Sequence, residues 1–228
     1  MDKSFKVRVS VGLGMFAVAL LGLYTFDSIP FKIIFGIFVA MSIIELLSFF
    51  HQKFTITNAI LAIIEIGFLV GGAIFVGKVD LSHFWYIILG VCGYDIFAYF
   101  SGKLVGGKLI KKHRPFPKIS KNKTWEGTIL GLAISIGITA IYMATQNGFT
   151  TDWYYLLASP LALVGDLYES YLKRRLKIKD SGEIVIKNKT FAWLEMLIGG
   201  SEGHGGYLDR IDSTAFASTI LLLFSILL

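Results

Sequence analysis

The sequence predicts an all-helical, polytopic integral membrane protein with about seven transmembrane helices, and three observations support this fold class. Of the 228 residues, 54% are hydrophobic, and the mean hydropathy of +0.66 is high for a soluble domain. Apolar runs long enough to cross a bilayer recur along the chain. The 22 Lys and Arg residues collect in a few segments between those runs. The lone Cys92 excludes a disulfide framework and a cysteine-built zinc site, and the four scattered histidines disfavour a histidine metal cage.

Seven apolar runs are predicted to span the membrane. The first follows three basic residues and has no small-residue cleavage site behind it, so we expect an uncleaved span rather than a signal peptide. The last is short for a hydrocarbon core of ~30 Å, so we expect its helix to begin near Leu208. The predicted spans are 9–26, 29–50, 56–76, 82–102, 127–145, 153–172 and 213–228.

The distribution of basic residues predicts the orientation. With the N-terminus inside, the segments 1–8, 51–55, 103–126 and 173–212 are cytoplasmic and hold 20 of the 22 Lys and Arg residues. The sequence therefore predicts the N-terminus inside and the C-terminus outside. The cations then face cytoplasmic nucleotides and lipid head groups, and nucleic acid is not an expected partner.

Two carboxylates fall inside the first predicted spans. Glu45 and Glu65 would each cost about 2.5–3.5 kcal/mol if they faced lipid, so both should face protein or water. Two interpretations stand for each: a hydrogen bond to a neighbouring helix, or a place in the lining of a polar cavity.

The fourth predicted span carries a polar stripe. Asp95, Ala98, Tyr99 and Gly102 recur at i, i+3, i+4 and i+7, which places them on one helical face. This stripe favours a functional cavity that leads into the basic loop. A structural hydrogen bond between Asp95 and Tyr99 is the competing interpretation.

The loop before the fifth span combines hydroxyl, ammonium and carboxylate groups. Ser120, Lys123, Thr124 and Glu126 are candidate substrate contacts there, and Ser120 is also expected as a helix N-cap. The nearby Gly102–Lys108 segment superficially matches a phosphate-binding P-loop. It is rejected because Leu109 stands where Ser or Thr must bind Mg²⁺.

The sixth span ends in a second polar stripe. Asp166, Glu169, Ser170 and Lys173 share one helical face and should point inward, towards other helices or a cavity. Glu169 and Lys173 would pair across one turn. Asp166 still needs a partner, and a metal shared with Asp209 would supply one.

The last polar stretch, Gly203–Ser213, reads GHGGYLDRIDS. Its glycines permit close approach of the backbone to phosphate oxygens. Asp209 and Asp212 lie three residues apart beside Arg210 and would share a helical face. Carboxylates suited to Mg²⁺ and a cation suited to phosphate, at the edge of a membrane, indicate phosphate chemistry on a lipid.

These ordered blocks resemble the signature of the phosphatidate cytidylyltransferases (CDP-diacylglycerol synthases). The resemblance covers roughly Asp95 to the C-terminus. Its blocks are Asp95-x-x-Ala98-Tyr99-x-x-Gly102, Ser120-x-x-Lys123-Thr124-Trp125-Glu126-Gly127, Ser170-Tyr-Leu-Lys173-Arg174 with Lys179-Asp180, and Gly203-His204-Gly205-Gly206 with Asp209-Arg210-Ile-Asp212-Ser213.

The resemblance implies transfer of a cytidylyl group from CTP to phosphatidate. It also implies a homodimer in the cell membrane with the active site facing the cytoplasm. Mg²⁺ is the implied cofactor, and whether K⁺ binds as well is left open. Asp166 and Asp209 match the metal-binding aspartates. The implied catalytic group comprises Asp166, Asp209, Lys173, Arg174, Lys179, Asp180, His204, Arg210 and Asp212. The implied substrate contacts are Asp95, Tyr99, Ser120, Lys123, Thr124, Glu126, Ser170, Gly205 and Gly206.

On this view the chain is a single membrane domain, 1–228. Residues 1–80 form a scaffold of three spans, and 81–228 form the cytidylyltransferase core. The chain departs from the family pattern in two places. Lys121 replaces a proline, and an insert at 183–202 lengthens the link before Gly203 and is expected to act as a lid, a lipid-selecting flap or a dimer contact.

Two alternatives stay open from the sequence. One is a related CTP-using enzyme with another lipid acceptor, such as a CDP-archaeol synthase or a polyprenol-type kinase. The other is a transporter or a non-catalytic membrane subunit, because carboxylates within the membrane also mark ion pathways. The sequence shows no internal repeat of the kind that common transporters have, which disfavours the second.

Overall fold

The computed structural model of the chain describes residues 29–52, 54–108, 110, 114–146, 152–176 and 208–227, and every regular element within these ranges is helical. The predicted first span and the 183–202 insert lie outside the described residues. In chain order the elements are α2 (Ile29–Gln52), α3 (Ile56–Lys78), α4 (Leu81–Val105), α5 (Trp125–Thr145), the 3-10 helix η1 (Trp153–Leu157), α6 (Ala158–Leu176) and α9 (Leu208–Leu227).

The other six predicted spans coincide with these helices, and the sixth corresponds to η1 followed by α6. The last helix begins at Leu208, as the length argument predicts. Among the described residues, α3, α4 and α5 are long and apolar enough to cross a membrane, and α9 adds a shorter apolar stretch, Ile211–Leu227. The fold is therefore that of a helical, membrane-embedded protein.

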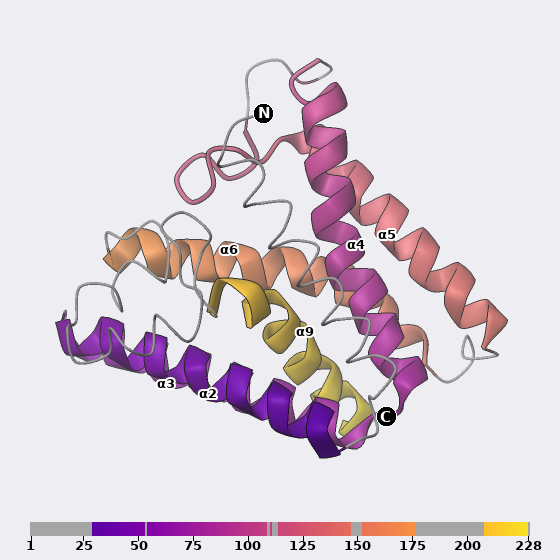
Figure 1. Cartoon of the computed structure of the whole chain (residues 1–228). Coiled ribbons are helices and arrows are strands. Elements are labelled where there is room, and N and C mark those ends of the chain that lie inside the picture. Colours follow the sequence, from indigo (N-terminus) through magenta and orange to yellow (C-terminus); the bar gives the residue numbers. More distant parts are fainter. Residues whose placement is uncertain are drawn as a thin grey trace, which may run out of the picture.

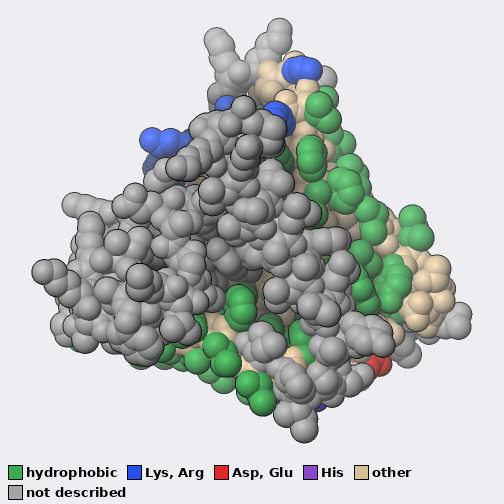
Figure 2. Space-filling model, viewed as in Figure 1, with side chains coloured by type: hydrophobic (Ala, Val, Ile, Leu, Met, Phe, Trp, Pro, Cys, Tyr) green, Lys and Arg blue, Asp and Glu red, His purple; other side chains and the backbone are tan. Residues whose placement is uncertain are grey.

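The helices form two packed groups that α6 connects (Figure 1). α4 lies along α5, while α9 packs against α3 and α6 and α2 packs against α3. A core of aromatic side chains, with Phe75, Tyr86 and Tyr155 fully buried, lies where these groups meet. Figure 2 shows hydrophobic side chains along the edge formed by α4 and α5, and Lys and Arg side chains at its upper end. The apolar edge suits contact with lipid tails.

The close packing of α4 on α5 depends on glycine. A Cβ atom at Gly131 would lie 2.7 Å from the Ala98 Cβ and 2.8 Å from its Cα, and one at Gly127 would lie 2.7 Å from the Ala98 carbonyl oxygen. Small residues of this kind permit helix backbones to approach closely inside membranes. The start of α5 is thereby held against the last turns of α4, which carry the first polar stripe.

Three helices begin with side-chain caps. The Thr55 hydroxyl accepts from the Asn58 N–H at 3.2 Å, and the Asp80 carboxylate accepts from the His83 N–H at 2.9 Å. At the start of α5 the cap is Thr124, whose hydroxyl accepts from the Gly127 N–H at 3.1 Å. The expected Ser120 cap is therefore wrong. Ser120 lies in a turn, where its N–H donates to the Phe116 carbonyl, and α5 starts only after Thr124.

Glu45 stabilises the start of α9. Its side chain is 6% exposed, and its Oε2 accepts from the Leu208 N–H at 2.9 Å. The first N–H groups of a helix have no partner within the helix and carry its positive dipole end, so a carboxylate is stabilising there. The interpretation of Glu45 as hydrogen-bonded to a neighbouring helix is confirmed.

Candidate active site

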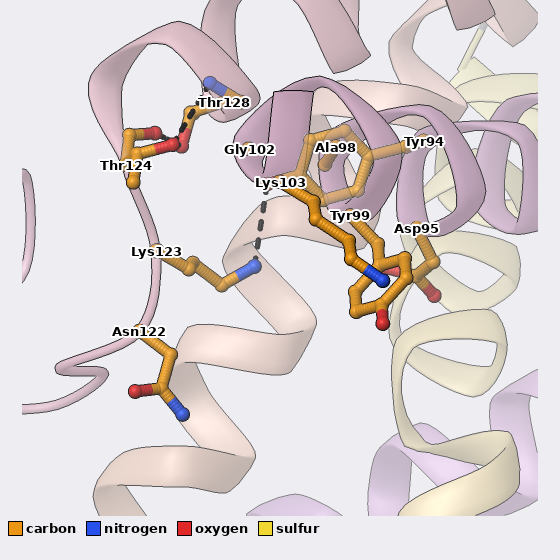
Figure 3. Close-up of a pocket in the computed structure, with 11 residues that line it drawn as sticks. Tyr94, Asp95, Ala98, Tyr99, Gly102, Lys103, Asn122, Lys123, Thr124 and Thr128 are labelled. Atoms are coloured by element: carbon orange, nitrogen blue, oxygen red, sulfur yellow. Dashed lines mark hydrogen bonds between the residues drawn. The ribbon is translucent and has the colours of Figure 1, made fainter. Parts of the chain in front are cut away.

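A pocket of about 350 Å³ lies between the last turns of α4 and the start of α5 (Figure 3). All four members of the α4 stripe line it. No hydrogen bond joins Asp95 to Tyr99 among the described residues, so the competing structural interpretation of the stripe lacks support. The opposite wall is the segment 122–124 with Gly127 and Thr128. Two sequence blocks, 94–103 and 122–128, thus share one cavity.

Lys123 connects this pocket to α6. Its ammonium forms an ion pair with the Asp166 carboxylate, donates to the Tyr94 hydroxyl at 3.3 Å and lies 5.1 Å from the centre of the Tyr94 ring. Burial alone would lower the pKa of Lys123, but the Asp166 carboxylate and the Tyr94 hydroxyl more than offset it, so the pKa is raised. A lysine cation is therefore held directly on the aspartate that the sequence assigns to a metal.

The α6 stripe points into the same region. Glu169 is 3% exposed, and its Oε2 pairs with the Lys173 Nζ at 2.6 Å, so the predicted pairing across one turn is confirmed. Ser170 is half-buried beside them. Arg174 is exposed, and its Nε donates to the Ile119 carbonyl at 3.4 Å, which ties the end of α6 to the loop before α5.

α9 brings its acidic residues to α6. A Cβ at Gly165 would lie 3.0 Å from the Ser213 Cα, so the two helices touch next to Asp166 and Asp212. Asp212 is 7% exposed, and the charged groups that act on it include Asp166, Lys173 and Glu65. Asp209 lies about one turn before this contact, at the start of the helix.

Glu65, on α3, is the residue that the sequence-derived site omits. It is 2% exposed, its Oε2 has no hydrogen-bond partner among the described residues, and it acts electrostatically on Asp212. A buried carboxylate oxygen without a partner is costly and is characteristic of functional sites. The sequence feature that could have identified Glu65 is a glutamate inside an apolar run.

Some of the remaining predicted residues lie near the pocket, and the others lie outside the described residues. Glu126 is buried, and its Oε1 accepts from the Ile110 N–H at 2.9 Å, which places it against the loop. The hydroxyl of Thr124 serves as the α5 cap at the pocket wall, and Ser120 is half-buried nearby. Outside the described residues lie Lys179, Asp180, His204, Gly205 and Gly206, together with the side chains of Asp209 and Arg210.

The described residues supply some of the ligands that a divalent cation needs. Asp166 supplies carboxylate oxygens, the ligands that Mg²⁺ prefers, and already attracts the Lys123 ammonium. The described His, Cys, Asp and Glu side chains form no group of three that is close enough to hold a metal. Mg²⁺ sites commonly use one or two carboxylates together with substrate phosphates and water, so Asp166 with one further carboxylate would be enough to hold the ion.

Comparison with known proteins places these residues in a family. The model of the Cytidylyltransferase family matches residues 56–187, more than half of the chain. The chain belongs to the cytidylyltransferase family. The matched range includes the pocket, Lys123, Asp166 and the α6 stripe, so it covers the site described above.

Several proteins similar to this chain are named phosphatidate cytidylyltransferase. The protein from Rickettsia felis is 35% identical over 154 residues, covering 63% of this chain and 60% of its own. That from Helicobacter pylori is 36% identical over 137 residues, covering 59% and 43%. That from Rickettsia conorii is 32% identical over 188 residues, covering 76% and 72%. The chain thus spans less than two thirds of the length of the first two relatives.

Proposed function

We propose that this chain transfers the cytidylyl group of CTP to phosphatidate, which gives CDP-diacylglycerol and pyrophosphate. The observation that carries the proposal is the Lys123–Asp166 ion pair, which joins a polar pocket to the acidic and basic face of α6 within the family-matched range. The names of the relatives favour phosphatidate over the other lipid acceptors.

In this reaction a phosphate oxygen of the lipid attacks the α-phosphorus of CTP. A new P–O bond forms as the bond to the β-phosphate breaks, and pyrophosphate leaves. Both reactants are anions, so catalysis is mostly neutralisation of charge and positioning. We assign this neutralisation to Lys173 and Arg174, in the last turn of α6, and to Arg210, near the start of α9.

The attacking lipid phosphate needs no strong base. Its second pKa of ~6 leaves it largely a dianion near neutral pH, so it is already a nucleophile. We accordingly assign His204 to positioning or contacting phosphate. Lys179, Gly205 and Gly206 are further phosphate contacts in this proposal, and Asp180 and Asp212 orient the cations.

We assign Mg²⁺ to Asp166 and Asp209, which the touching helices α6 and α9 carry. When bound, the ion neutralises phosphate charge and polarises the reacting phosphoryl group. Lys123 then holds Asp166 in place and adds positive charge at the wall of the pocket.

The proposal includes a position in the membrane. Seven spans with the N-terminus inside place the ends of α4 and α6, and the start of α9, on the cytoplasmic side, where CTP is found. We place the protein in the cell membrane as a homodimer, with the active site facing the cytoplasm. The concentration of Lys and Arg in the cytoplasmic segments supports this orientation.

Pyrophosphate release tests the proposal. Purified protein in nanodiscs should release pyrophosphate only when CTP, Mg²⁺ and phosphatidate are all present, and Asp209→Ala and Asp166→Asn should abolish release while remaining folded. Release that does not depend on phosphatidate, or that survives both substitutions, would contradict the proposed reaction.

A further inference from the structure

The α4 wall of the pocket presents an acceptor, a ring and a cation on one helical face. Asp95, Tyr99 and Lys103 follow one another at i, i+4 and i+8, and Figure 3 shows their side chains on the same side of α4. Asp95 makes no hydrogen bond or ion pair with any described residue. Tyr99 is 64% exposed, so a face of its ring is open to a ligand.

Asp95 needs polar surroundings. It lies ten residues before the end of α4, about 15 Å along the helix axis, yet its side chain is exposed on the molecule. A charged carboxylate at such depth is unfavourable against lipid and must face water, protein or ligand. Because Asp95 only accepts hydrogen bonds when ionised, its ligand must donate N–H or O–H groups rather than present phosphate.

We infer that this pocket binds the cytosine base of CTP, with Asp95 accepting from the exocyclic amine and Tyr99 stacking on the ring. This rests on the proposed function, which makes CTP a substrate. An aspartate that accepts from the cytosine amino group is a known mode of recognising this base, and tyrosine rings stack on bases. Uracil presents a carbonyl oxygen at the same position, which the carboxylate would repel.

The neighbourhood of the pocket agrees with this placement. Asp95 lies within electrostatic range of both Lys123 and Asp166, which belong to the phosphate end of the proposed site. A nucleoside bound against α4 would therefore have its phosphates near the Lys123 ammonium rather than in lipid. Asp95 would then be a specificity-determining residue that reads the base, apart from the groups that act on phosphorus.

The test compares CTP with UTP in the full-length protein in nanodiscs. Asp95→Asn should lower the ratio of kcat/KM for CTP to that for UTP by about tenfold or more, because the amide both donates and accepts. Asp152→Asn, near His83 at the other end of α4, is the matched control and should leave this ratio unchanged. Tyr99→Ala should weaken both nucleotides alike by about tenfold or more, and Tyr99→Phe should retain binding.

Equilibrium binding of CTP and UTP without phosphatidate separates this inference from the proposed function. If wild type forms no lipid product but prefers CTP, and Asp95→Asn removes that preference, the inference stands and the proposed reaction fails. If wild type forms the product and a folded Asp95→Asn variant keeps the full preference for CTP, the inference is overturned. Equal losses for CTP and UTP in Asp95→Asn would also overturn it, since they would assign the carboxylate to the ribose.

Discussion

Replacing Lys123 with methionine should destabilise the fold and impair activity together. Methionine keeps most of the apolar stem but removes the ammonium that contacts Asp166 and Tyr94. Asp166 then loses its ion-pair partner, and the loop before α5 loses one of its contacts with α6, while the Arg174–Ile119 hydrogen bond remains. We expect kcat/KM for CTP to fall at least about 100-fold, because a positioned cation leaves the site.

The loss of stability can be estimated from the contacts. The hydrogen bond to the Tyr94 hydroxyl at 3.3 Å contributes about 0.5–1.5 kcal/mol, and the cation–π contact at 5.1 Å about 0.5–1 kcal/mol. The Lys123 and Asp166 side chains are 18% and 31% exposed, so their pair is worth about 1 kcal/mol rather than the 3–5 kcal/mol of a buried pair. The expected total is about 2–3.5 kcal/mol.

A double-mutant cycle isolates the ion pair. Reversible unfolding in detergent is measured for Lys123→Met, Asp166→Asn and the double variant, and we expect a coupling free energy of about 1 kcal/mol. Lys121→Met is the matched control, because Lys121 is exposed in the same loop and should change stability by less than about 0.5 kcal/mol. Zero coupling, with activity within about twofold of wild type, would refute the assignment of Lys123 to the site.

Three further predictions concern packing, capping and pH. Gly131→Ala should destabilise the fold by about 1–3 kcal/mol, because the new Cβ would meet the Ala98 backbone. Gly137→Ala is the control and should not destabilise the fold, because a Cβ at Gly137 has no atom within 4 Å. Equal effects of the two substitutions in thermal unfolding would contradict the packing account. Glu45→Ala should lower the free energy of unfolding by about 1–3 kcal/mol, because it removes the hydrogen-bond acceptor at the start of α9. Glu45→Gln keeps an acceptor and should lower it less. Equal losses for the two variants in thermal unfolding would argue against the cap. Because the pKa of Lys123 is raised in the fold, its contribution is complete below the usual value of 10.5 and is lost as pH rises through the raised value. Wild type should therefore lose its stability advantage over Lys123→Met only above about pH 10.5, and a loss between pH 7 and 9 would exclude this pair as the cause.

The helices and their caps show how far local pattern predicts structure. The start of α9 at Leu208 and the Glu169–Lys173 pair both follow from spacing along one helix, and both are confirmed. The Ser120 cap failed because Ser120 and Thr124 are both hydroxyl residues ahead of the same helix. The turn that joins Ser120 to Phe116 decides between them, and helix periodicity does not encode it.

Contacts between segments that are distant in the chain could not be predicted from the sequence. The stripe on α4 and the polar residues before α5 each indicated a site, but only the packing of Gly127 and Gly131 on Ala98 brings them to one pocket. Likewise Asp166 was predicted to need a partner, for which a metal shared with Asp209 was suggested. The described partner is Lys123, 43 residues earlier in the chain, and the assignment of Mg²⁺ to Asp166 and Asp209 stays a prediction.

The most direct test of the central claim follows the label of CTP into lipid. The protein in nanodiscs containing phosphatidate is given CTP radiolabelled at either the α- or the γ-phosphorus, and the lipid is extracted and separated. The account predicts that α-label appears in CDP-diacylglycerol and that γ-label appears only in released pyrophosphate. Transfer of γ-label to lipid would instead show a kinase, and absence of α-label from lipid would contradict cytidylyl transfer.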